Sequence, residues 1–76
     1  MAAFDVAAFY KFVSLPGYAG LQVPIRALCE DNGVKGILLL APEGINGTLA
    51  GPPAGLARVL AGIRSYPEFI DLEHKA

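Results

Sequence analysis

The stretch VKGILLLAPEGINGTLAG, residues 34–51, decides the fold. Its first half, residues 35–41, contains four consecutive aliphatic residues that would point to both faces of a sheet. Such a run is typical of a strand that is covered on both sides. Residues 42–44, Pro-Glu-Gly, end this strand, and residues 45–50 predict a second strand. Since Asn46-Gly47 is a turn-forming dipeptide, we interpret the stretch as a β-hairpin.

Upstream of the hairpin, a further strand is predicted over residues 6–13, VAAFYKFV. The segment is rich in aromatic and β-branched residues and stops before a turn at residues 14–17. Because side chains alternate across a strand, one face would carry Val6, Ala8, Tyr10 and Phe12, and the other Ala7, Phe9, Lys11 and Val13. Both faces are mostly apolar, so the strand has side chains to bury on each side.

Apolar residues at helical spacing predict a helix over residues 19–32, with Leu21, Ile25 and Leu28 on one side. Pro24 is tolerable only near the start of such a helix, where few backbone N–H groups have partners. Glycine readily adopts the left-handed conformation that follows the last turn of many helices, so Gly33 predicts the end of this helix.

A second helix is predicted to begin at Gly51-Pro52-Pro53, because proline favours the first helical positions. Its core stripe, at helical spacing, consists of Leu56, Val59, Leu60 and Ile63. Gly55 and Gly62 would lie on the opposite side, and Tyr66-Pro67 would end the helix. Apolar and charged residues then alternate over residues 70–75, which predicts a fourth strand at the edge of the sheet.

The resulting order, βαββαβ, gives an α+β ferredoxin-like fold, the split βαβ arrangement, when the crossovers are right-handed. The antiparallel sheet would have the spatial order 4-1-3-2, with both helices on one face. The other face would be open and would form a contiguous apolar patch. A chain of 76 residues allows a single domain, residues 1–76. Since the alternation is still running at residue 75, we expect that the boundary of this chain is artificial.

Charge and cysteine content limit the classes of partner and compartment. The formal net charge is −1 and the basic residues are spread along the chain, so strong binding of nucleic acid by this chain alone is not predicted. A single cysteine and an N-terminus without the basic region of a signal peptide favour the cytoplasm. The apolar run at residues 36–42 is too short to span a bilayer, so no membrane partner is predicted.

No catalytic residue, metal ligand or cofactor loop is predicted in this chain. Cys29 lies near the core stripe of the first helix, where burial would raise its pKa and make the thiol inert. His74 has no cysteine or histidine at ligand spacing, which argues against a metal site. The glycine-rich segment of the hairpin lacks the lysine of a phosphate-binding loop.

The hairpin also carries a family resemblance. The pattern K-G-x-x-L-L-A-x-E-G-I-N-G-T-x-A-G, residues 35–51, resembles the signature of the bacterial rhodanese-domain tRNA uridine hydroxylases. Three further stretches agree with it: FYKFVSLPGY (9–18), ALCEDNGVKG (27–36) and DLEHK (71–75). The resemblance covers residues 7–75. The sequence departs from it at Ile37, where many members carry threonine, and at Pro52, where a helix-capping serine is common.

The resemblance implies that this chain is the accessory N-terminal domain of a larger enzyme. That enzyme would 5-hydroxylate the wobble uridine of tRNA, with molecular oxygen as co-substrate and the essential cysteine in a C-terminal rhodanese-like domain. Its partners would be that domain in cis and tRNA, and the chain alone would not be an enzyme. We predict that Lys11, Glu43, Asn46 and Thr48 lie near the substrate or the domain junction; turn formation or solvation is the alternative role for all four.

Three other interpretations stay open. The chain could be a stand-alone binding or regulatory module of the same fold. It could be a hydrolase of the acylphosphatase type, although residues 14–18 lack the arginine that this chemistry needs. Finally, Tyr10 and Phe12 could stack RNA bases on the open face, as aromatic residues do on RNA-binding sheets.

Overall fold

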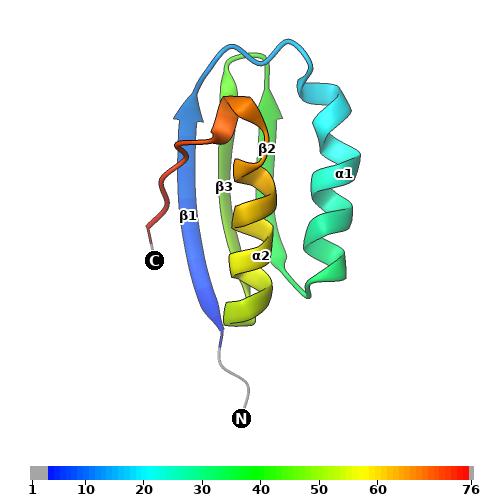
Figure 1. The fold of residues 1–76 in the computed structure, drawn as a ribbon, viewed down its shortest axis with the longest axis vertical. Coiled ribbons are helices and arrows are strands. Elements are labelled where there is room, and N and C mark those ends of the chain that lie inside the picture. The colour runs from blue at the N-terminus through cyan, green and yellow to red at the C-terminus, as the bar shows by residue number, and fades with distance from the viewer. Residues whose placement is uncertain (1–3, 76) are drawn as a thin grey trace.

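The computed structural model describes residues 4–75, which form three strands and two α-helices followed by a short 3-10 helix (Figure 1). The elements are β1 (Asp5–Phe12), α1 (Tyr18–Asp31), β2 (Lys35–Ala41), β3 (Gly44–Gly51), α2 (Pro53–Arg64) and η1 (Pro67–Phe69). Each of the two helices and the first three strands predicted from the sequence is present, with bounds shifted by two residues at most. None of the helices within residues 4–75 is long and apolar enough to cross a membrane.

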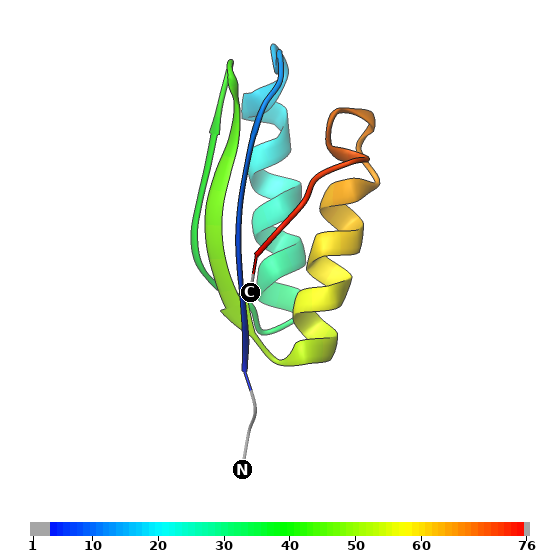
Figure 2. The ribbon, with the colours of Figure 1, turned by 90° about the vertical axis from the view of Figure 1, so that its left-hand side faces the viewer.

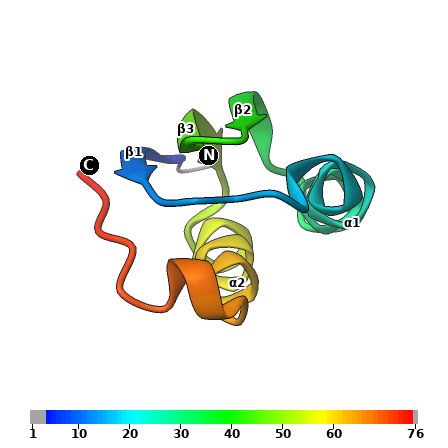
Figure 3. The same ribbon diagram turned by 90° about the horizontal axis from the view of Figure 1, so that it is seen from above.

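The sheet is antiparallel and has the order β1-β3-β2. Both helices lie on the same face, as the two views turned from Figure 1 show (Figures 2 and 3). Helix α2 covers β1 and β3, whereas α1 lies beside β2. The α+β class and the order of these three strands were therefore predicted correctly.

The turn of the hairpin lies between the two predicted strands, at residues 42–43, and not at the Asn46-Gly47 dipeptide. Ala41 pairs with Gly44, so the connection consists of Pro42 and Glu43 alone. Gly44 has a φ of 149°, which residues with a Cβ rarely adopt. Asn46-Gly47 instead lies inside β3, because this register buries Ile45 and Leu49 under the helices.

The fourth strand predicted over residues 70–75 is absent from the part of the chain that the structure describes. The chain turns through η1 after α2, and only Lys75 forms an isolated antiparallel bridge, with Ala8. This bridge lies on the side of β1 away from β3. Phe69 and Leu72 enter the core, whereas Ile70 remains exposed. The apolar residues of this segment therefore belong to a turn and an extended segment that pack on the core, and not to a strand.

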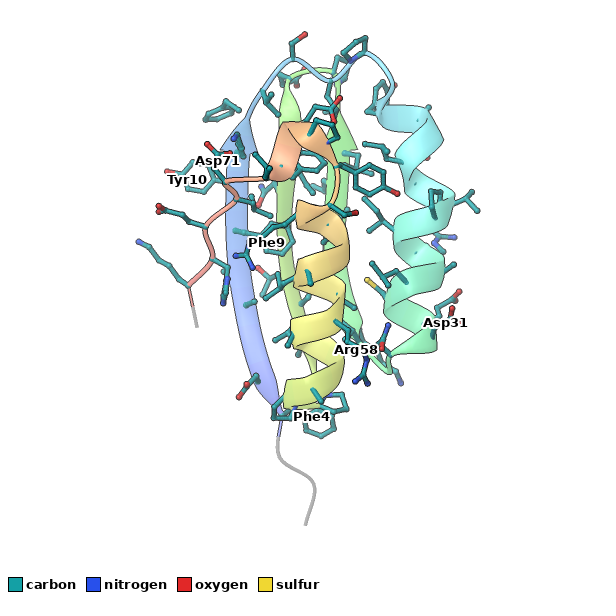
Figure 4. The ribbon with its side chains drawn as sticks, viewed as in Figure 1. Phe4, Phe9, Tyr10, Asp31, Arg58 and Asp71 are labelled. Atoms are coloured by element: carbon teal, nitrogen blue, oxygen red, sulfur yellow. The ribbon has the colours of Figure 1, made fainter. Side chains whose placement is uncertain are left out.

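The core lies between the sheet and the helices. Phe9 projects from β1 toward α2 and is only 4% exposed (Figure 4). Its ring lies over Gly47 of β3: a Cβ placed on this glycine would come within 2.9 Å of Phe9 Cζ. The predicted stripe of α2 is buried in the same core, as are Ile25 of α1 and Leu15 of the β1–α1 loop.

The two helices pack closely, and the glycines of α2 explain why. Gly55 and Gly62 face α1 rather than solvent, because Cβ atoms there would lie 2.3 Å from the carbonyl oxygen of Asn32 and 2.4 Å from Leu28 Cδ2. Arg58 Nε also donates a 2.6 Å hydrogen bond to Asn32 Oδ1, at the end of α1 (Figure 4). The expectation that both glycines lie opposite the core was therefore wrong.

The ends of α1 follow the predicted signals in part. Asn32 caps the helix and Gly33 follows with a left-handed φ of 68°, as predicted. Pro24, however, is the seventh residue of α1 and so lies further inside the helix than expected. The residue is exposed, as is Gly20, whose carbonyl loses its usual partner four residues on.

Candidate functional site

The face of the sheet opposite the helices is the most distinctive surface of the molecule. Five large apolar side chains from β1 and β2 lie on it, with exposures of 47–81%: Val6, Tyr10, Phe12, Ile37 and Leu39. The register explains why they gather there. Tyr10 and Leu39 both pair with Asn46, and Ile37 pairs with Thr48, so these side chains occupy one face. The apolar patch predicted for the open face is present.

Tyr10 and Phe12 form an aromatic pair at one end of this open face. Their ring centroids lie 5.9 Å apart and the ring planes meet at 64°, an edge-to-face arrangement. Beside them is an open hollow of about 280 Å³, which is also lined by Leu39, Ala41 and Gly44. The hollow exists because the small side chain of Ala41 lies between larger side chains on the open face.

Charge is nearly absent from the open face. Lys35 is its only charged strand residue, and it lies at one end, in the row of Ala50 and Val6. Asn46 and Thr48 supply polar groups along β3, in the middle of the sheet. Such a surface suits a largely apolar partner that can also form a few hydrogen bonds.

Of the four residues predicted near a substrate or domain junction, Lys11, Glu43 and Asn46 border the hollow, whereas Thr48 lies further along β3. Asn46 and Thr48 lie on the open face, and Glu43 lies in the β2–β3 turn beside the hollow. Lys11 alternates with Tyr10, so its side chain lies on the helical side of the sheet, where it forms an ion pair with Asp71. The hydrogen bond from Lys11 and its charge lower the pKa of Asp71.

Cys29 is half-buried rather than buried. It lines a cleft of about 390 Å³ between α1 and β2, together with charged residues that include Arg26 and Glu30. Burial raises the pKa of the Cys29 thiol, and the carboxylate of Glu30 raises it further. A raised pKa leaves less thiolate at neutral pH, which is the opposite of what an activated nucleophile requires.

His74 is held by an arginine rather than by a group that could serve in catalysis. Its Nδ1 lies 2.9 Å from a terminal nitrogen of Arg64, and Arg64 Nε donates a 2.8 Å hydrogen bond to the carbonyl oxygen of Leu72. Arg64 thus ties the segment after η1 to α2. Within residues 4–75, no three His, Cys, Asp or Glu side chains come together as a group that could hold a metal ion.

Two backbone amides between β1 and α1 already donate hydrogen bonds to the hairpin turn. Leu15 is 1% exposed, and its amide donates a 2.8 Å hydrogen bond to the carbonyl oxygen of Pro42. The amide of Val13 donates to the carbonyl oxygen of Glu43 at 3.0 Å. These amides join the loop to the hairpin turn and are not available to surround a phosphate.

Sequence reasoning did not identify the residues that shape the hollow. Ala41 carries no chemical signal of its own, because its contribution is the space that its small side chain leaves. Gly44 instead allows the close approach of the Lys11 backbone, since a Cβ there would lie 2.0 Å from the Lys11 carbonyl oxygen. The role of Asp71 was also missed, since it pairs with a lysine 60 residues away. The face of Lys11, in contrast, follows from its spacing of two residues from Phe9, because such residues share one face of a strand.

Comparison with known protein families matches residues 4–76 to the family described as UPF0176 acylphosphatase like domain. Three similar proteins are each named tRNA uridine(34) hydroxylase. The protein from Rhizobium etli is 65% identical over 72 residues, that from Sinorhizobium medicae 58% over 72 residues, and that from Albidiferax ferrireducens 55% over 75 residues.

These alignments cover 95–99% of this chain but only 23–24% of each relative. The chain thus spans about a quarter of the length of the relatives that it matches. The resemblance to tRNA uridine hydroxylases that the sequence suggested is confirmed, and it lies in one domain of those proteins. By its match over nearly all of its residues, the chain belongs to the UPF0176 acylphosphatase-like domain family.

Proposed function

We propose that this chain is the accessory N-terminal domain of a cytoplasmic enzyme that hydroxylates the wobble uridine of tRNA. The observation that carries the proposal is the 65% identity to the Rhizobium etli tRNA uridine(34) hydroxylase across 95% of this chain. The reaction consumes molecular oxygen and forms 5-hydroxyuridine. Its chemistry belongs to a rhodanese-like domain that provides the essential cysteine.

The chemistry of the chain's own residues supports an accessory role. The thiol of Cys29 has a raised pKa, and the ring nitrogen Nδ1 of His74 faces the cation of Arg64. Neither group is prepared for nucleophilic or general-base work. We assign Asn46, Thr48 and Glu43 to contacts with the partner domain, and Lys11 to holding the segment after α2 rather than to phosphate.

A chimera tests this function. The segment of the Rhizobium etli hydroxylase that aligns with this chain is replaced by residues 4–75, and the chimera is expressed in a strain without its own hydroxylase. We expect 5-hydroxyuridine in its tRNA, detected by mass spectrometry of nucleosides, and none when cells are grown without oxygen. The 76-residue chain expressed alone should form none.

Two outcomes would contradict the proposal. A folded chimera that forms no 5-hydroxyuridine would show that this domain cannot serve in the enzyme. Formation of 5-hydroxyuridine by the 76-residue chain would show that the chemistry lies in this domain. The parent Rhizobium etli enzyme in the same strain is the positive control.

A stand-alone binding module is the second candidate function, because the helices and sheet enclose a complete core while the apolar face stays exposed. If the chain is such a module, it should bind a separate protein in the absence of the rest of a hydroxylase. An acylphosphatase-type hydrolase is disfavoured, since the amides of Val13 and Leu15 already donate to the hairpin turn.

A further inference from the structure

The open face exposes a group of large apolar side chains to water. Phe12 is 81% exposed, Tyr10 70%, Ile37 68% and Leu39 60%, and they lie on strands that share one register. Scattered exposed apolar residues are ordinary, but a contiguous group across several strands marks an interaction surface.

The hollow gives this surface an anchor point. Tyr10, Phe12 and Leu39 surround it, and the small side chain of Ala41 leaves space between them. Interfaces draw most of their binding energy from a few large side chains seated in such pockets, with neighbouring contacts excluding water. An apolar side chain of a partner fits this lining, and Asn46 beside it can accept or donate a hydrogen bond.

The charge pattern selects a protein partner over RNA. Proteins that bind single-stranded RNA combine stacking rings with basic groups that follow the backbone. Here Lys35 is the only basic strand residue on the face, and the ammonium group of Lys11 is held by Asp71 on the helical side. The hollow beside the rings of Tyr10 and Phe12 is also bordered by Glu43, whose negative charge disfavours a phosphate backbone.

The family relationship identifies the occupant. The similar hydroxylases contain this domain as about a quarter of their length, so some three quarters of each chain lies outside it. An apolar face on a domain that is carried within a longer chain is the natural contact for the rest of that chain.

We propose that the open face of the sheet is the docking surface for the part of the hydroxylase outside this domain. One apolar side chain of that part occupies the hollow beside Tyr10, Phe12 and Leu39. This inference rests on the proposed function, and it explains why large apolar side chains are exposed on the open face.

The experiment compares one substitution in two settings. Leu39→Asp is introduced into the chimera described above and into the 76-residue chain, and thermal unfolding is followed in both. The side chain is 60% exposed in the isolated domain, so the substitution costs little packing there. In the chimera we expect the melting temperature of this domain to fall by about 4 °C or more beyond the change in the isolated chain.

Val23→Asp is the matched control. Val23 is 76% exposed but lies on α1, away from the open face, so its effect should be equal in the two settings. Ala41→Phe is a second test that adds no charge: it fills the hollow and should weaken docking in the chimera while leaving the isolated chain folded.

Several results would overturn the docking proposal. Equal losses for Leu39→Asp in both settings would show that nothing covers the face. Dimerisation of the isolated chain that Leu39→Asp abolishes, with equal losses in the chimera, would assign the face to a second copy. Tight tRNA binding by the isolated chain that Tyr10→Ala abolishes would assign it to RNA.

Failure of the proposed function is distinguishable from these results. It is judged on the unsubstituted chimera, by the presence or absence of 5-hydroxyuridine. An active chimera in which Leu39→Asp has no added effect rejects docking alone.

Discussion

Gly47 has no side chain because the ring of Phe9 occupies the adjoining space. A Cβ on Gly47 would lie 2.9 Å from Phe9 Cζ and 3.1 Å from the carbonyl oxygen of Ile37. Neither neighbour can move easily, since Phe9 is buried in the core and Ile37 is part of the β2–β3 ladder. We expect Gly47→Ala to lower the free energy of unfolding by about 1–3 kcal/mol, the usual effect of overpacking, as measured by urea denaturation.

Two variants control this prediction. A Cβ on Gly20 of α1 meets nothing within 4 Å, so Gly20→Ala should raise the free energy of unfolding by about 0.5–1 kcal/mol. Phe9→Leu should cost less in the Gly47→Ala background than in the parent chain, because the smaller side chain relieves the contact. A Gly47→Ala protein as stable as its parent would show that the ring of Phe9 moves freely.

Cys29 should react slowly with disulfide reagents. Burial raises the pKa of its thiol, and the Glu30 carboxylate raises it further, so less thiolate is present at pH 7.5 than in free cysteine. Glu30→Gln removes a negative charge, lowers the pKa and should increase the labelling rate. Stopped-flow or spectrophotometric labelling measures both proteins, and a Cys29 as fast as free cysteine would contradict the assignment.

At the level of elements, periodicity in the sequence predicted most of the fold. The apolar run at residues 37–40 and the stripe of α2 left few alternatives, because burying them requires a sheet covered by helices. The predicted strand bounds placed the hairpin turn correctly at residues 42–44, although Asn46-Gly47 favours a turn locally. The dipeptide stays inside β3 because the tertiary register buries Ile45 and Leu49 on either side of it. Local turn preference was thus overridden by core burial.

The segment after α2 shows a different limit. Alternation over residues 70–75 is compatible with a strand, but a strand also needs a partner along its length. Here η1 turns the chain and only Lys75 reaches β1, at Ala8. The pairing of Lys11 with Asp71 could not be foreseen either, since it depends on this path. The apolar open face could be foreseen, because alternation alone determines which side chains face away from the helices.

This segment should be essential to stability although it contains little regular structure. Phe69 is fully buried, and Phe69→Ala should cost about 3–5 kcal/mol, a large part of the stability of a domain this small. Ile70 is its neighbour and is 74% exposed, so Ile70→Ala should change the free energy of unfolding by less than about 0.5 kcal/mol. Urea denaturation followed by circular dichroism compares the two, and equal effects would show that the segment is not packed as described.

For the whole molecule, the arrangement of charged side chains decides whether the domain can bind nucleic acid more than the net charge does. The chain has six basic residues against seven acidic ones. Three of the basic side chains are held by neighbours: Lys11 by Asp71, Arg58 by Asn32, and Arg64 by the carbonyl oxygen of Leu72. The remaining three, Arg26, Lys35 and Lys75, come from three different segments, α1, β2 and the end of the chain. No face therefore presents the row of cations that a nucleic-acid backbone requires.

The isolated domain should consequently bind tRNA weakly, with a dissociation constant above about 10⁻⁴ M at physiological salt. Fluorescence anisotropy with labelled tRNA measures this constant, and the Rhizobium etli hydroxylase, a similar enzyme that contains this domain, serves as the comparison. Tyr10→Ala should leave the weak binding unchanged, because Lys11, the basic residue that borders the hollow beside the rings, is paired with Asp71. A micromolar constant that falls steeply with salt would mean that this domain contacts the backbone directly. A micromolar constant that depends on Tyr10 would instead mean that the open face stacks bases, and the partner of that face would then be the RNA itself.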